Sequence, residues 1–154
     1  MEVFTKIFNL KVLLVLIISF PVVAQEKNAN EKSVMLEYND PTLEWGGCPD
    51  FMPEGCEIAV LHGDPAEKNV DVFFKVPANS EIPNHYHTSV ERMILVAGEL
   101  EVTYEGEQPK TLKVGSYAFG PAGKPHSAKC GDSPCVLFIG FEEPLDAIPV
   151  ATKN

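Results

Sequence analysis

The stretch Ile82–Glu91, which reads IPNHYHTSVE, decides the expected fold and chemistry of this chain. Side chains two residues apart on a β-strand point to the same face, so His85 and His87 project together and Tyr86 projects away. Glu91 shares their parity if the strand continues without a bulge. Two imidazoles and a carboxylate on one buried face are costly unless a divalent cation binds them. Taken alone, the pattern also fits two surface histidines beside a surface glutamate.

A second stretch brings a third histidine from a distant part of the chain. It runs Gly115-x5-Pro121-x-Gly123-x2-His126. The glycines and the proline favour a tight turn that aims His126. The presence of both stretches in one chain favours a metal site over unrelated surface histidines.

Together, His85-x-His87-x3-Glu91-x6-Gly98 and this second stretch resemble the two sequence motifs of the cupin superfamily. The resemblance covers residues 57–141 and implies an all-β fold, a double-stranded β-helix or small jelly-roll barrel. It also implies a metal ion inside the barrel, with the ligands His85, His87, Glu91 and His126. Three imidazoles and a carboxylate suit one divalent transition metal, Fe, Mn, Zn, Ni or Co, and sequence does not choose among them.

Two positions depart from the family pattern. Asn79 stands where the first motif usually has glycine, and asparagine is the residue that best replaces glycine at positive φ. Cys130 stands where the second motif usually ends in asparagine. A disulfide to Cys135 would replace that contact, whereas a free thiol at Cys130 would approach the site.

The rest of the barrel region consists of short apolar or alternating runs separated by turns. Leu100, Val102 and Tyr104 alternate with polar residues, which is typical of a half-buried strand. No segment has a sustained 3.6-residue apolar period, so a sandwich or barrel is expected. We expect a further edge strand at Val34–Tyr38.

The first 24 residues have the order of a secretory signal peptide. Lys6 and Lys11 precede the apolar run Val12–Phe20, and small residues lead to Ala24. The apolar run is too short to cross a bilayer, so no stable membrane anchor is expected. We expect cleavage after Ala24 and a periplasmic or secreted protein. Residues 25–56 then form an N-terminal extension with a Cys/Pro/Gly-rich loop, and residues 142–154 form a tail.

The four cysteines agree with export, because disulfides persist in oxidising compartments. We favour the pairs Cys48–Cys56 and Cys130–Cys135, each of which closes a short loop. A zinc site built from cysteines is the alternative. The spacings Cys-x7-Cys and Cys-x4-Cys argue against it, because zinc sites usually contain Cys-x2-Cys.

Charge limits the classes of partner. Removing Glu2, Lys6 and Lys11 from the 12 basic and 22 acidic residues leaves a mature chain with a net charge of −11. Such a surface repels phosphate backbones and anionic membranes, so nucleic acid is excluded as a partner. A small-molecule substrate or ligand is expected instead. Family resemblance and unpaired sheet edges also suggest a homodimer.

A few other residues invite a role. His62 precedes a turn outside both motifs, and either an acid–base role at the barrel mouth or turn packing fits it. Arg92 should point away from Glu91 into a structural ion pair, whereas Met93 and Leu95 should face the cavity. The Trp45–Cys56 loop covers the cavity or packs outside the barrel.

An octahedral ion with these four ligands keeps two open positions. We therefore expect a small-molecule enzyme, first of all a dioxygenase-like oxidoreductase. A metal-dependent isomerase or lyase, in which the metal acts as a Lewis acid, is the alternative. A non-catalytic, sensor-type cupin that holds a metal or ligand is a third interpretation. The sequence assigns no catalytic residue beyond the ligands.

Overall fold

Short apolar or alternating runs of sequence form the β-strands of this protein. The computed structural model describes residues 32–151, and all of the helices and strands assigned in this range are β-strands, with no helix among them. The predicted signal peptide therefore lies outside the described residues. The strands are β1 (Trp45–Gly47), β2 (Glu57–His62), β3 (Val70–Val76), β4 (Glu81–Tyr86), β5 (Glu91–Ala97), β6 (Glu99–Tyr104), β7 (Lys110–Lys113), β8 (Tyr117–Gly120), β9 (His126–Cys130), β10 (Cys135–Phe141) and β11 (Ile148–Pro149).

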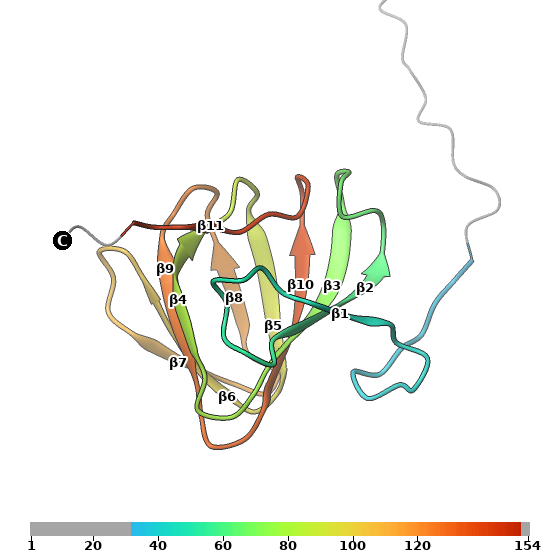
Figure 1. Cartoon of the computed structure of the whole chain (residues 1–154), viewed down its shortest axis with the longest axis horizontal. Helices are drawn as coiled ribbons and strands as arrows, with labels where there is room; N and C mark the ends of the chain where they lie inside the picture. Colours follow the sequence, from blue (N-terminus) through green and yellow to red (C-terminus); the bar gives the residue numbers. More distant parts are fainter. Residues whose placement is uncertain (1–31, 152–154) are drawn as a thin grey trace, which may run out of the picture. The chain divides into compact units, whose positions relative to one another are not determined.

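These strands form two antiparallel sheets, as the all-β jelly-roll prediction requires (Figure 1). One sheet has the order β1-β2-β3-β10-β5-β8, and the other has the order β11-β4-β9-β6-β7. Sequence neighbours are often separated in the sheets, since β10 lies between β3 and β5 and β9 lies between β4 and β6. This interleaving brings the two halves of the proposed metal site together. No helix within residues 32–151 is long and apolar enough to span a membrane.

The hydrophobic core lies between the sheets and takes residues from both. Val72, Leu95 and Leu137 come from the larger sheet, and Leu100 and Val102 come from the smaller one. Strand β5 is buried at alternate positions from Glu91 to Leu95, which is the pattern of a strand with one face toward a core. The same face therefore carries both the core side chains and the polar site.

The sequence prediction differs from the structure at the N-terminal end of the described range. Residues 34–38 form no strand, because the segment pairs with neither sheet edge. The expected tail contains β11, whose Ile148 and Pro149 pair with Tyr86 and His85 of β4. In Figure 1 this C-terminal segment, drawn in red, runs from the end of β10 across to β4.

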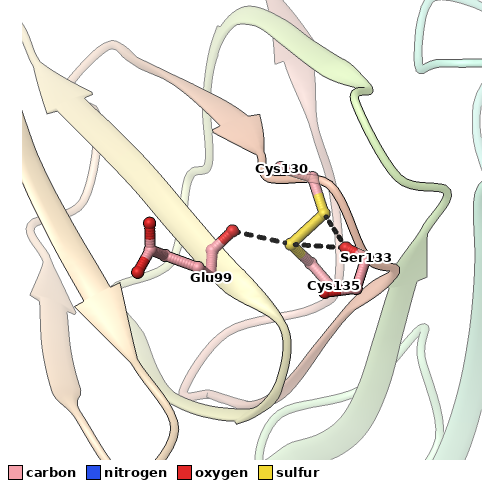
Figure 2. The surroundings of a disulfide bond; sticks show 4 residues. All are labelled: Glu99, Cys130, Ser133 and Cys135. Atoms are coloured by element: carbon pink, nitrogen blue, oxygen red, sulfur yellow. Dashed lines mark hydrogen bonds between the residues drawn. A yellow bond between two sulfur atoms is a disulfide. The ribbon is translucent and has the colours of Figure 1, made fainter.

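The two departures from the family pattern have clear local roles. Asn79 has a φ of 60°, the left-handed conformation for which asparagine is suited. Cys130 is joined to Cys135 across the turn at 131–134 (Figure 2). The carbonyl oxygen of Ser133 lies 3.1 Å from Cys130 Sγ, and that of Glu99 lies 3.1 Å from Cys135 Sγ. The second disulfide joins Cys48 to Cys56, so no free thiol remains among residues 32–151.

Candidate metal centre

Three histidines and a glutamate meet between the two sheets. His85 lies near the end of β4, His87 just beyond it, and His126 at the start of β9, paired directly with His85. Glu91 begins β5 in the opposite sheet. His85, His87, Glu91 and His126 are only 4, 8, 2 and 6% exposed. Polar side chains buried to this degree require partners.

Glu91 does not approach the histidines along the same strand, as shared parity with His85 and His87 would require. The strand does not continue from His87 to Glu91, because residues 87–90 leave β4 and lead into β5 of the other sheet. The condition for shared parity, a strand that continues from His87 to Glu91, is therefore not met. Glu91 meets His87 and His126 because the two sheets face each other.

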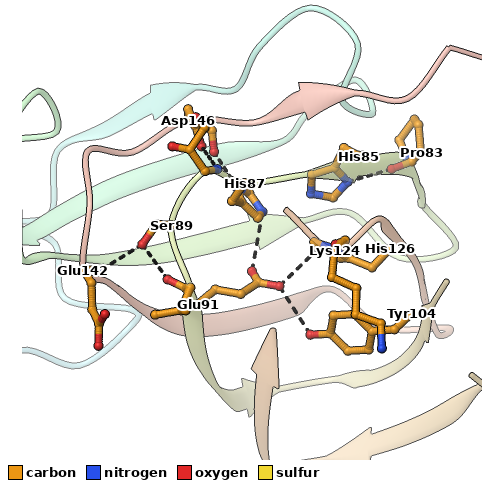
Figure 3. A network of polar contacts seen from close by, with 12 residues as sticks. Pro83, His85, His87, Ser89, Glu91, Tyr104, Lys124, His126, Glu142 and Asp146 are labelled. Carbon is orange, nitrogen blue, oxygen red and sulfur yellow. Dashed lines mark hydrogen bonds and ion pairs between the residues drawn. The ribbon is translucent and has the colours of Figure 1, made fainter. Parts of the chain in front are cut away.

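Each histidine directs its Nδ1 atom at a main-chain carbonyl oxygen (Figure 3). The distances are 2.7 Å from His85 to Pro83 and 3.3 Å from His126 to Lys124, and His87 contacts Asp146. A carbonyl oxygen only accepts hydrogen bonds, so Nδ1 carries the proton in the neutral ring. The lone pair of each neutral imidazole is therefore on Nε2, the arrangement that metal-binding histidines usually have.

These lone pairs are directed into a small volume. One nitrogen from each ring of His85, His87 and His126 lies within 4.8 Å of the others. The Glu91 carboxylate borders them, with Oε2 3.5 Å from His87 Nε2 and Oε1 3.2 Å from His126 Nε2. Tyr104 donates its hydroxyl proton to Glu91 Oε1 over 3.3 Å. Figure 3 shows Glu91 between the two histidines and Tyr104.

Burial controls ionisation at this site. It lowers the pKa of His85 to about 4, an effect opposed by the hydrogen bond to Pro83 and assisted by His87. Burial also lowers the pKa of His126 to about 3, assisted by His85 and His87. It raises the pKa of Glu91, against the charge of His87 and the hydrogen bond from Tyr104. His85 and His126 are therefore neutral at pH 7, as metal ligands must be.

The donor set fits a cation. In these tautomers the Nε2 atoms of His87 and His126 are acceptors, and so are both oxygens of an ionised Glu91. Acceptors at 3.2–3.5 Å from one another repel unless a proton or a positive ion lies among them. A divalent ion satisfies three nitrogens and a carboxylate together.

A cavity of about 460 Å³ adjoins the four side chains. Most of its wall is apolar, including Val72, Phe74, Met93, Ile139 and Phe141. Among the residues that the structure describes, no lysine or arginine lines this cavity. A ligand in the cavity therefore meets an apolar surface with one polar end.

The Trp45–Cys56 loop both lines the cavity and packs against the outside of the barrel. Pro49 and Met52 line the cavity, and the loop is tied by the Cys48–Cys56 disulfide. Trp45 instead packs in a separate apolar cluster, with the Lys75 ammonium 4.2 Å from its ring centre. The loop thus forms part of the cavity wall, and the packing of Trp45 in the separate apolar cluster fixes one end of it.

The other candidate residues lie as follows. His62 is in β2 and does not line the cavity. Arg92 points to solvent and pairs with Glu142, as expected of a structural ion pair. Met93 lines the cavity, whereas Leu95 is fully buried in the core beside it.

Four residues near the site were not identified from the sequence: Ser89, Tyr104, Gly120 and Asp146. Asp146 lines the cavity and its main-chain oxygen accepts from His87. Gly120 pairs with Glu91 across β5 and β8. A glycine in a strand pattern often marks a close approach, and this was the available signal for Gly120. Tyr104 was placed on a half-buried strand without a role.

Comparisons with known proteins agree with this geometry. The family model described as a cupin domain matches residues 72–141. Dimethylsulfoniopropionate lyase DddQ of Ruegeria pomeroyi is 31% identical over 106 residues, which cover 67% of this chain and 53% of the lyase. The chain thus spans about half the length of this curated relative. The crystal structure of that lyase superposes with a TM-score of 0.60 at 25% identity, over 71% of this chain and 61% of the lyase chain.

Two more distant structures share the fold alone. The polyketide cyclase RemF of Streptomyces resistomycificus has a TM-score of 0.62 at 18% identity, covering 79% of this chain and 89% of its own. Bacillus subtilis oxalate decarboxylase, studied for its Mn(II) centres, has a TM-score of 0.55 at 16% identity over 62% and 28% of the two chains. The family match, the relatives, the two-sheet fold and the buried histidine cluster all agree. The chain belongs to the cupin superfamily.

Proposed function

We propose that the protein is a metal-dependent enzyme that holds one divalent transition metal ion through His85, His87, Glu91 and His126. The convergence of three buried histidines, each with Nδ1 directed at a main-chain carbonyl, carries this proposal. A bound ion of this kind supplies Lewis-acid activation of a carbonyl or carboxylate oxygen. The metal is Fe, Mn, Zn, Ni or Co, all of which accept such ligands.

The reaction class that we propose is that of a lyase. A dioxygenase-like oxidoreductase was the first expectation from the sequence, with a lyase or isomerase as the alternative. The 31% identical relative is named as a lyase and supports the alternative. Since this chain spans about half of that relative, its substrate has to be tested directly.

The cavity favours a small substrate with one carboxylate or carbonyl end. Because no lysine or arginine is among the described residues that line the cavity, the metal is the cation to which such an end would bind. The rest of the substrate would then contact apolar walls that include the aromatic rings of Phe74 and Phe141. Aromatic rings accommodate an onium group as well as an alkyl group.

The chain's own residues prepare this reaction in three ways. The carbonyls of Pro83, Lys124 and Asp146 hold the histidine protons at Nδ1. Burial, followed by the charge of Glu91, raises the pKa of Tyr104, so its hydroxyl stays protonated and donates a hydrogen bond to Glu91. The apolar walls exclude water, which strengthens electrostatic interactions inside the cavity.

The test combines metal analysis with a substrate assay. Protein loaded separately with each of the five metals is incubated with dimethylsulfoniopropionate, and its consumption is followed by nuclear magnetic resonance. We expect one metal per chain and consumption that stops on chelation. His126→Ala should lose metal and activity, whereas His62→Ala should retain both. Full metal content in His126→Ala would disprove the ligand set, and consumption by metal-free protein would disprove metal dependence.

We also infer that the protein is exported as a mature chain starting at Gln25. The two disulfides are typical of oxidising compartments and support this inference. Intact mass measurement on protein secreted by its native host should give a chain without residues 1–24. A mass that includes Met1 would contradict cleavage. Light scattering on the same sample tests the expected homodimer, which a monomeric mass would contradict.

A further inference from the structure

The segment 142–150, here called the C-terminal strap, lies beyond the end of the cupin-domain match at residue 141. The strap pairs with β4, the strand that carries His85. β11 pairs with β4 at His85 and Tyr86, and the amide of Val150 donates to the Asn84 carbonyl over 3.0 Å. Without the strap, β4 would be the exposed edge of its sheet. Edge strands lose register and order more readily than strands paired on both sides.

Asp146 holds the next part of the motif at two points. Its main-chain oxygen accepts the Nδ1 proton of His87, and its Oδ1 atom accepts the amide proton of Thr88 over 2.9 Å. One residue of the strap therefore contacts two consecutive residues of the metal-binding motif. The first contact sets the tautomer of His87, and the second sets the position of the backbone that carries this ring. Figure 3 shows His87 beside Asp146.

The start of the strap is fixed to the same motif. Ser89, which is 1% exposed, accepts the amide protons of Glu142 and Glu143 at its Oγ atom, over 2.9 and 3.0 Å. The amide of Leu145 donates to the Pro65 carbonyl over 2.9 Å. Anchors on both sides of Asp146 therefore hold this residue against His87. Leu145, Asp146 and Ala147 then form part of the cavity wall.

We propose that the strap is a positioning element of the metal centre, and that Asp146 is the residue that couples strap docking to metal binding through His87 and Thr88. The proposal rests on the metal site proposed above. It adds that metal affinity depends on nine residues outside the two cupin motifs. Coupling is reciprocal, so a bound metal must also tighten the docking of the strap.

The first experiment measures Co2+ affinity by competition with a chelator, together with the visible absorption spectrum of the bound Co2+. Asp146→Ala removes the acceptor for Thr88 and should weaken Co2+ binding about 10- to 100-fold, the usual effect of losing a group that orients a ligand. It should also alter the spectrum, which reports coordination geometry. Asp146→Asn retains a side-chain oxygen acceptor and should stay within about threefold of wild type.

Glu143→Ala is the matched control in the same strap. It removes one negative charge and the exposed ion pair with Lys68, but it keeps the amide that donates to Ser89. It should bind Co2+ like the wild type with an unchanged spectrum. If Glu143→Ala weakens binding as much as Asp146→Ala, charge rather than positioning is responsible, and the proposal is overturned.

The second experiment is amide hydrogen exchange with and without Zn2+. In the wild type, Zn2+ should slow exchange at the amides of Thr88, Leu145 and Val150. In Asp146→Ala, Zn2+ at a saturating concentration should slow the Leu145 and Val150 amides much less. This comparison remains informative even if Asp146→Ala is less stable. Equal protection in both proteins would show that the strap and the metal are not coupled.

His87→Ala separates the two proposals. If His87→Ala binds Co2+ as tightly as wild type, the metal site itself is wrong. If His87→Ala loses binding while Asp146→Ala retains wild-type affinity and spectrum, the metal site stands and the role of the strap is overturned.

Discussion

Gly120 lies directly across from Glu91 in the β5–β8 pair, and the missing side chain of the glycine leaves the space that the Glu91 carboxyl group occupies. A β-carbon at position 120 would lie 2.5 Å from Glu91 Cγ and 2.9 Å from Cδ. Real β-carbons essentially never approach other atoms this closely. The observed position of the Glu91 side chain therefore requires glycine at position 120, although the two residues are 29 positions apart in the chain.

Gly120→Ala should displace Glu91 and weaken metal binding by about tenfold, since the carboxylate would leave the position from which it faces His87 and His126. Metal affinity by chelator competition is the measurement. Gly46→Ala in β1 is the control, because a β-carbon there would meet a neighbouring carbonyl oxygen at 3.8 Å, an ordinary contact. Unchanged affinity in Gly120→Ala would indicate that Glu91 is not a ligand.

Tyr104→Phe should weaken metal binding about three- to tenfold at pH 7, and more at lower pH. The Tyr104 hydroxyl donates to Glu91 and lowers the pKa of this carboxyl, so its loss favours the protonated form that does not ligate. A single hydrogen bond is worth about 0.5–1.5 kcal/mol, which sets the range. Affinity is measured at several pH values. Tyr117→Phe, a change at a side chain that is 59% exposed, should leave the affinity and its pH dependence as in the wild type.

The metal-free protein should lose stability as the pH falls from about 6.5 to about 4. In the unfolded chain both imidazoles have a pKa near 6.5, whereas the folded protein lowers the pKa of His85 to about 4 and that of His126 to about 3. Between these values the unfolded chain binds more protons, so protonation favours unfolding. The raised pKa of Glu91 has the opposite sign and offsets part of this loss.

Urea unfolding of chelator-treated protein at pH 7 and pH 5 checks this prediction. The free energy of unfolding should be lower at pH 5, and His126→Gln should show a smaller difference between the two pH values. A free energy that is constant or higher at pH 5 would mean that the histidines are already charged in the folded protein.

The two disulfides should have separable effects. Replacing either pair by serine should lower the free energy of unfolding by about 2–3 kcal/mol through loop entropy in the unfolded chain. Only loss of Cys48–Cys56 should also speed metal release to a chelator, because Pro49 and Met52 in its loop line the cavity. Cys130 and Cys135 do not line the cavity, so their replacement serves as the control. Equal release rates in the two variants would contradict a covering role for the loop.

Much of the fold was predictable from local sequence. Period-two alternation of apolar and polar residues in Leu100–Tyr104 identified a strand, because a strand with one buried face requires that pattern. The positive φ of Asn79 was expected because this asparagine stands where the resembled motif usually has glycine. Short spacing also favoured the two cysteine pairs that the structure joins. The cupin family was recognisable because its motifs contain the glycines, the proline and the histidines at characteristic intervals.

Tertiary structure decided the relationships that cross between sheets or reach the site from far along the chain. Glu91 faces His126 because β5 and β9 lie in opposite sheets, not because of its parity with His87. Gly120, Tyr104 and Asp146 belong to the site through contacts with residues 13 to 59 positions away. Alternation and turn residues report only which face of a strand is buried. Which buried faces meet depends on how the strands interleave, and that is a property of the whole fold.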